Sequence, residues 1–122
     1  MMLEQERTSY IIRGCVFEVY RQLGCGYLEK VYERALLREL SLHGLHAKVQ
    51  VPFEVRYKGG VAGEYFADMV VERSIILKLK AQQLLPRESE AQLLNYLKAS
   101  GLRLGLLINF AFPRARIKRV IL

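Results

Sequence analysis

The stretch YFADMVVERSIILKLKA, residues 65–81, governs how the rest of the chain can fold. It predicts two β-strands joined by a short turn at Arg73 and Ser74, because apolar and β-branched residues flank this polar pair. Side chains alternate across a strand, so Lys78 and Lys80 share one face of the second strand while three aliphatic residues share the other. The second strand therefore has one charged face and one face suited to a core.

Asp68 lies among apolar neighbours on the first of these strands. Charged side chains inside apolar strands are costly unless they are paired or put to use. An acid on one strand and two amines on the next, Lys78 and Lys80, could form a phosphate site, a metal site or a salt bridge at the edge of a sheet. From these residues alone we favour the salt bridge.

Helical periodicity and strand alternation assign the elements on both sides of this hairpin. Gly24-Cys25-Gly26 separates two amphipathic helices, and Gly44 ends the second. Pro52 predicts an edge position or a bulge for the strand that contains it. We expect helices at residues 8–23, 28–43 and 88–100, strands at residues 49–57, 61–72, 74–81 and 102–110, and one more short strand after Pro113.

This order predicts an α/β fold with a mixed central β-sheet flanked by α-helices. The first three strands would meander, and the helix at residues 88–100 would cross over to a strand buried on both faces. The chain has 122 residues, enough for one domain with a real core. We therefore predict a single domain over residues 1–122.

The chain is basic, with a net charge of +7 and a pI near 9.6. This balance suits nucleic acid as a partner, DNA in the first place, and the alternative is a solvated basic surface. The end of the chain predicts an exposed basic strip made of Arg114, Arg116, Lys118 and Arg119. The sequence shows neither a membrane span of roughly 18 apolar residues nor a signal peptide. We expect a cytoplasmic protein that binds no membrane, and a homodimer is left open.

The cysteines and histidines carry no metal-binding pattern. Cys15 and Cys25 have neither the spacing of a metal site nor a disulfide framework, and Cys15 lies on an apolar helical stripe, as expected for a buried thiol. His43 and His46 flank Gly44 at the predicted end of a helix. Capping or solvent exposure explains these two histidines better than metal ligation does.

Residues 26–32, GYLEKVY, fit the pattern GxxExxY, which names a family of small bacterial and archaeal proteins. The blocks VYERAL, QVPFEVRYKG, YFADMVVE and EAQLLNYLKASGLRLGLLINF also fit, in the same order. The chain thus resembles the GxxExxY family from about residue 11 to residue 120. That family is placed in the PD-(D/E)XK nuclease superfamily, so the resemblance implies a restriction-endonuclease-like core.

The resemblance also implies Mg²⁺-dependent phosphodiester hydrolysis, in which an Asp and a Glu hold the metal and a Lys two residues after the Glu acts on the attacking water. Carried over by position, Asp68 is the first metal ligand, Lys80 is the lysine of the motif and Glu29 is the helical acid. Gln92 and Tyr96, one helical turn apart, resemble the QxxxY element that lines such sites.

Structural roles remain open for several of these residues. Glu29 could interact only with the N-terminus of its own helix. Tyr32, the tyrosine of the GxxExxY pattern, could simply be core. Gln92 and Tyr96 could be a surface pair.

One position departs from the motif, which requires Glu-x-Lys where this chain has Lys78-Leu79-Lys80. An ammonium about 4 Å from a divalent ion repels it by about 8 kcal/mol at an effective dielectric of 20, and by roughly 2 kcal/mol in water. Either figure predicts weak Mg²⁺ binding. Glu29 is the best substitute ligand and Glu88 is another, whereas Glu64 and Glu72 lie too far along the strand.

Three functions are compatible with this sequence. We predict a nuclease-like protein that binds nucleic acid and whose catalysis is impaired by Lys78, which stands in the place of an acidic metal ligand. The first alternative is an active Mg²⁺-dependent DNA endonuclease that uses a displaced acid, Glu29 or Glu88. The second is a non-enzymatic protein-interaction module, in which Asp68, Glu29 and the lysines form a buried ion network.

Overall fold

The computed structural model describes residues 2–122, and their side chains from residue 4 onward. Within this range the helices and strands follow one another as the sequence predicts, including the short last strand. They are α1 (Met2–Leu23), α2 (Glu29–Leu42), β1 (Ala47–Tyr57), β2 (Gly60–Val71), β3 (Ile75–Lys80), α3 (Glu88–Ser100), β4 (Leu104–Phe110) and β5 (Ala115–Ile121). α1 begins earlier than expected because good helix formers precede Thr8. The helices of the described range include no candidate membrane span.

The strands form one mixed sheet in the order β1-β2-β3-β4-β5. β1, β2 and β3 meander antiparallel, β3 and β4 are parallel, and β5 returns antiparallel to β4. The parallel pair needs a crossover, which α3 provides. This topology confirms the predicted α/β fold with a mixed sheet. β1, which contains Pro52, is an edge strand as expected.

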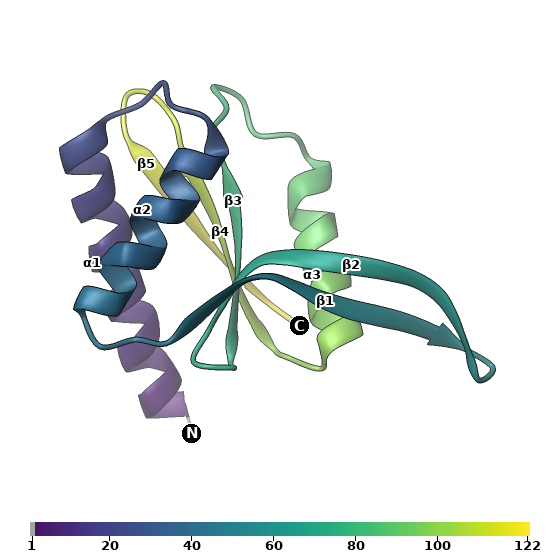
Figure 1. Ribbon diagram of the computed structural model, residues 1–122. Helices are drawn as coiled ribbons and strands as arrows, with labels where there is room; N and C mark the ends of the chain where they lie inside the picture. Colours follow the sequence, from purple (N-terminus) through teal and green to yellow (C-terminus); the bar gives the residue numbers. More distant parts are fainter. Residues whose placement is uncertain (1) are drawn as a thin grey trace.

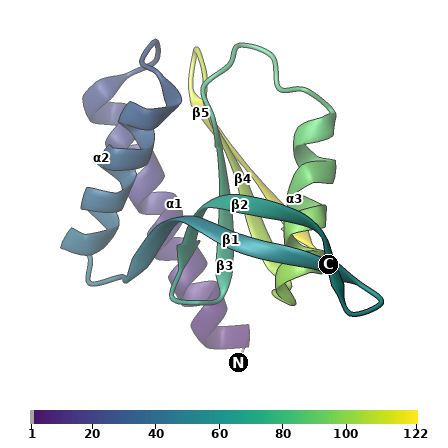
Figure 2. The same cartoon turned by 45° about the vertical axis from the view of Figure 1, so that its right-hand side comes forward.

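Helices cover both faces of this sheet (Figures 1 and 2). α1 and α2 lie on one face, where their apolar side chains pack with Ile75, Leu77 and Leu79 of β3. α3 lies on the other face, where Leu93 packs with Ile76. All of β4 is buried, because it runs between these two helical layers. The aliphatic face of β3 is therefore the core face under α1 and α2, as the alternation predicts.

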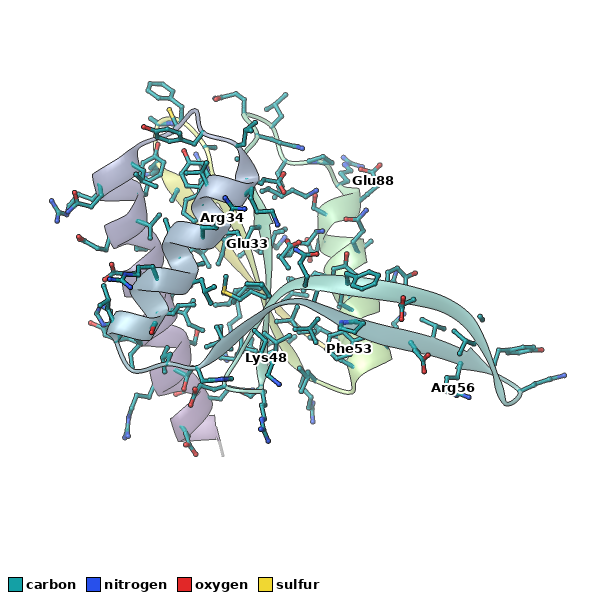
Figure 3. The ribbon with its side chains drawn as sticks, viewed as in Figure 1. Glu33, Arg34, Lys48, Phe53, Arg56 and Glu88 are labelled. Atoms are coloured by element: carbon teal, nitrogen blue, oxygen red, sulfur yellow. The ribbon has the colours of Figure 1, made fainter. Side chains whose placement is uncertain are left out.

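β2 separates from β3 partway along its length. Only its last residues, 69–71, pair with β3, whereas most of β2 pairs with β1. β1 and β2 therefore extend beyond the helices as a long hairpin (Figure 1), with Lys48 near its base and Phe53 and Arg56 farther along β1 (Figure 3). Asp68 lies at the resulting fork, one residue before the first β2 residue that pairs with β3.

Tyr32 ties the loop between α1 and α2 to the core. Its ring is fully buried and stacks on Phe110, with 4.4 Å between the ring centroids. Its hydroxyl donates to the carbonyl O of Gly24 at 2.6 Å and accepts a hydrogen bond from the N–H of Tyr27 at 3.3 Å. The tyrosine of the GxxExxY pattern is therefore a core residue in this fold.

Gly105 of β4 allows α3 to approach the sheet closely. A Cβ at this position would lie 2.8–3.0 Å from side-chain carbons of Leu93. Gly105→Val should therefore lower the free energy of unfolding by about 1–3 kcal/mol, the usual cost of overpacking, as measured by urea unfolding. Gly63→Val is the control, because a Cβ at Gly63 meets no atom within 4 Å. Equal losses in both variants would show that the contact between α3 and β4 does not limit the residue at position 105.

Candidate functional site

The centre of the candidate site is the carboxylate of Asp68, at the point where β2 leaves β3. Its Oδ2 accepts a hydrogen bond from the backbone N–H of Leu79 at 2.7 Å. The same oxygen lies 3.9 Å from Nζ of Lys78, and the Lys78 and Asp68 side chains are only 12% and 18% exposed. The structure thus brings Asp68 and Lys78 together, as the alternation of the two strands predicts.

The ammonium of Lys78 also contacts Tyr96 on α3. Nζ donates to the Tyr96 hydroxyl at 3.4 Å and lies 5.3 Å from the centroid of the Tyr96 ring. Tyr65 of β2 packs edge-on against this ring, with 5.4 Å between the centroids, and supports its orientation. The Lys78 ammonium therefore lies among a carboxylate, a hydroxyl and an aromatic ring, all of which favour a cation.

The protonation of Asp68 reflects both its burial and its charged neighbours. Burial raises the pKa of the Asp68 carboxyl above its usual range. The hydrogen bond from the Leu79 N–H and the ammonium of Lys78 lower this pKa, the carboxylate of Glu33 raises it, and Lys80 lowers it by a smaller amount. Because the pKa remains raised, the two lysines do not fully offset the cost of burying this charge.

The raised pKa predicts that the charge of Asp68 costs stability. A carboxyl with a raised folded-state pKa contributes most to stability below the ordinary pKa of an aspartate, and the contribution is lost as pH rises through the folded-state pKa. Asp68→Asn keeps an acceptor for the Leu79 N–H without the charge. It should raise the free energy of unfolding at pH 7, and this gain should vanish at acid pH, where the Asp68 carboxyl is protonated in both states.

Urea unfolding at several pH values measures this difference. Asp68→Ala is the control, because it leaves the Leu79 N–H without its acceptor and should be less stable than Asp68→Asn at every pH. A gain from Asp68→Asn that stays constant down to acid pH would contradict a role for the charge.

The acid of α2 whose charge acts on Asp68 is Glu33. Glu33 is 8% exposed, accepts a hydrogen bond from the side-chain amide of Gln50 at 3.2 Å and lies 3.2 Å from Nζ of Lys30. It projects from α2 on the side that faces the sheet (Figure 3). Glu29 is exposed at the first position of α2, one turn earlier on the same side of the helix. The sequence motif drew attention to Glu29, and only the packing of α2 shows the position of Glu33.

Gln50 is a second residue of this region that the sequence did not indicate. It lies in β1 opposite Asp68, between two regular backbone pairs of the β1–β2 ladder. Its φ is +51°, a left-handed conformation that is uncommon for residues other than glycine. Such strain persists where the surroundings fix the backbone, and here it accompanies the hydrogen bond to Glu33. A glutamine in an alternating strand gives no signal of this conformation.

The other predicted residues lie farther out on α3. Gln92 is exposed one turn before Tyr96, and Glu88 is exposed in the first turn of the helix (Figure 3). Within residues 4–122, no hydrogen bond or ion pair joins either side chain to Asp68. Tyr96 is therefore the residue of the predicted QxxxY pair that contacts the site, whereas the role of Gln92 stays a prediction.

The residues around Asp68 do not fit a Mg²⁺ ion. Mg²⁺ requires near-octahedral oxygen coordination and usually binds through one or two carboxylates. One oxygen of Asp68 is already bonded to a backbone N–H and faces an ammonium, and position 78 offers that ammonium in place of a second carboxylate. The nearby carboxylate of Glu33 is engaged by Gln50 and Lys30. These contacts favour the ammonium of Lys78 over a bound Mg²⁺ ion.

The basic end of the chain forms β5 and the turn before it. Its four cationic residues are exposed, as predicted: Arg114, Arg116, Lys118 and Arg119. Arg116 and Lys118 share one face of β5, as expected for a strip, but strand alternation places Arg119 on the opposite face, so the four residues do not form a single strip. Lys118 pairs with Glu90 of α3 at 2.8 Å, whereas Arg119 lines a hollow with Gln5 of α1.

Comparisons with known proteins agree with this architecture. A family model described as the PD-(D/E)XK nuclease superfamily matches residues 6–120. The crystal structure of SSO0001 is similar, with a TM-score of 0.62 and 21% sequence identity over 75% of this chain. At this identity the likeness concerns the fold alone, and the matched region is 48% of the SSO0001 chain. No curated protein sequence matches the chain.

Proposed function

Because the chain belongs to the PD-(D/E)XK nuclease superfamily, we propose that it binds nucleic acid, DNA in the first place, through a nuclease-like site whose metal-dependent catalysis is impaired by Lys78. The observation that carries this proposal is the position of the Lys78 ammonium, 3.9 Å from the Asp68 carboxylate and 3.4 Å from the Tyr96 hydroxyl. A cation supplied by the chain stands where the motif has an acidic metal ligand. The resemblance to the GxxExxY family supports the same proposal.

Two further features support nucleic-acid binding without a metal ion. The chain has a net charge of +7, which favours association with a polyanion. The β1–β2 hairpin carries exposed cations at Lys48, near its base, and at Arg56 (Figure 3), and Lys58 lies in its turn. The hairpin also carries acidic residues, and Arg56 pairs with Glu54 at 3.0 Å, so Lys48 and Lys58 are its cations best suited to contacts with the phosphate backbone, which fix position without reading bases.

The test is binding of the chain to a fluorescent DNA duplex in EDTA at several salt concentrations. We expect the logarithm of the affinity to fall linearly with the logarithm of the salt concentration. Lys78→Met should weaken binding several-fold and reduce the salt slope by about 1, as for the loss of one phosphate contact. Lys98→Met, on an exposed position of α3, is the matched control. No salt-dependent binding of DNA or RNA would reject the proposal and favour a protein-interaction module.

The second candidate function is an active endonuclease that uses a displaced acid. It is favoured by one observation, the carboxylate of Glu33 beside Asp68, and the structure thereby adds Glu33 to Glu29 and Glu88 as a candidate. A plasmid-nicking assay with Mn²⁺ separates the two functions. Nicking that is lost in Glu33→Gln and kept in Glu29→Gln would establish this candidate, whereas no nicking by the unmodified chain would reject it.

A further inference from the structure

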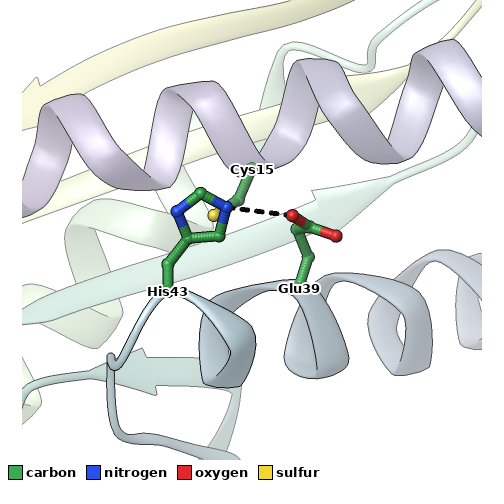
Figure 4. A group of neighbouring side chains, drawn as sticks. All are labelled: Cys15, Glu39 and His43. Atoms are coloured by element: carbon green, nitrogen blue, oxygen red, sulfur yellow. Dashed lines mark hydrogen bonds and ion pairs between the residues drawn. The ribbon is translucent and has the colours of Figure 1, made fainter.

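A second group of metal-ligating side chains lies between α1 and α2, outside the site at Asp68. Cys15 is fully buried on α1, and Glu39 and His43 lie one helical turn apart at the end of α2 (Figure 4). One donor atom from each residue lies within 4.8 Å of the other two, and Nε2 of His43 is 3.0 Å from Oε2 of Glu39. Three donors from two helices thus converge on one point.

We infer that Cys15, Glu39 and His43 form a binding site for a Zn²⁺-like cation. A thiolate, an imidazole and a carboxylate are the donors that bind Zn²⁺ in proteins, and sites with three protein ligands keep a fourth position for water. Bonds of roughly 2.0–2.3 Å place donor atoms about 3.2–3.8 Å apart around a tetrahedral ion. The observed separations therefore need only small side-chain movements. Mg²⁺ and Ca²⁺ are disfavoured, because they select oxygen ligands over a soft thiolate.

The surroundings of the three donors suit a bound cation. The side chain of His43 is 48% exposed and gives access from solvent, whereas the buried Cys15 closes the inner side. The carboxylate of Glu18 on α1 accepts hydrogen bonds from Arg21 and Gln22, so water is the expected fourth ligand.

This site would join the two helices that cover one face of the sheet. A ligand that binds only the folded chain raises the free energy of unfolding, so occupancy should raise the melting temperature. None of the three donors contributes to the site at Asp68. A negative result for the proposed function therefore leaves this inference unchanged, and a negative result here leaves the proposed function unchanged.

The experiment is a Zn²⁺ titration of the EDTA-treated, tag-free chain in competition with a chromophoric chelator, followed by Co²⁺ substitution. We expect one equivalent of Zn²⁺ to bind, and the Co²⁺ form to show thiolate-to-metal charge-transfer absorption. The chain supplies matched controls, because it has one cysteine and one histidine outside the group, Cys25 and His46. Cys15→Ser and His43→Gln should each weaken Zn²⁺ binding by more than the roughly 10- to 100-fold that loss of an outer partner costs. Cys25→Ser and His46→Gln should leave it unchanged.

Three outcomes would overturn the inference. They are the absence of stoichiometric Zn²⁺ binding, a Co²⁺ spectrum without thiolate absorption, and equal losses in the control variants. If Cys15→Ser fails to fold because Cys15 is buried, His43→Gln still decides, since His43 is at the surface.

Discussion

Replacing Lys78 with glutamate should give this chain a divalent-cation site at Asp68. The substitution exchanges an ammonium 3.9 Å from the Asp68 carboxylate for a second carboxylate. It also gives Lys80 the acidic residue two positions earlier that the Glu-x-Lys motif has. Removing roughly 2 kcal/mol of repulsion, the value in water, already corresponds to an affinity increase of about 30-fold, and a lower dielectric enlarges it. We therefore expect Lys78→Glu to bind Mn²⁺ at least about 30-fold more tightly than the unmodified chain.

Calorimetric titration of Mn²⁺ into both proteins measures this change, and a plasmid-nicking assay shows whether catalysis follows. Without metal the new carboxylate lies beside those of Asp68 and Glu33, so Lys78→Glu should be less stable in EDTA and recover with Mn²⁺. Lys98→Glu makes the same change of charge at an exposed position of α3 and should alter neither property. If the unmodified chain binds Mn²⁺ and cuts as well as Lys78→Glu, position 78 is not the ligand position.

Truncation of Tyr32 should cause the largest loss of stability among the variants considered. Tyr32→Ala removes a fully buried ring that stacks on Phe110 and leaves the Gly24 carbonyl and the Tyr27 N–H without their partner. Large-to-small changes of aromatic core residues cost about 3–5 kcal/mol. Tyr32→Phe keeps the ring and loses only the hydroxyl, for which we expect about 1–2 kcal/mol.

Urea unfolding of the two Tyr32 variants gives both free-energy changes. Tyr10→Ala is the matched control, because Tyr10 is 78% exposed on α1 and should change stability by less than about 0.5 kcal/mol. Losses of similar size in Tyr32→Ala and Tyr32→Phe would mean that the hydroxyl, rather than the ring, carries the stabilisation. A loss in Tyr10→Ala equal to that in Tyr32→Ala would contradict the burial argument.

Much of the fold follows from local patterns in the sequence. Strand alternation separates Lys78 from Ile75, Leu77 and Leu79, and the structure places these three residues under α1 and α2. The alternation also brings Lys78 next to Asp68. Pro52 indicated an edge strand, which β1 is. These features depend on a period of two or on the chemistry of one residue, so neighbouring residues suffice to predict them.

The sequence by itself therefore determined the order of the elements, the mixed sheet and the cation beside Asp68. Only the tertiary structure decided which turn of α2 lies beside Asp68, because Glu29 and Glu33 share one side of the helix and packing selects between them. The same holds for the left-handed backbone of Gln50 and for the meeting of Cys15 with Glu39 and His43. The physical reason is that each of these features depends on how one element packs against another. The residues next to each position in the sequence do not determine that packing.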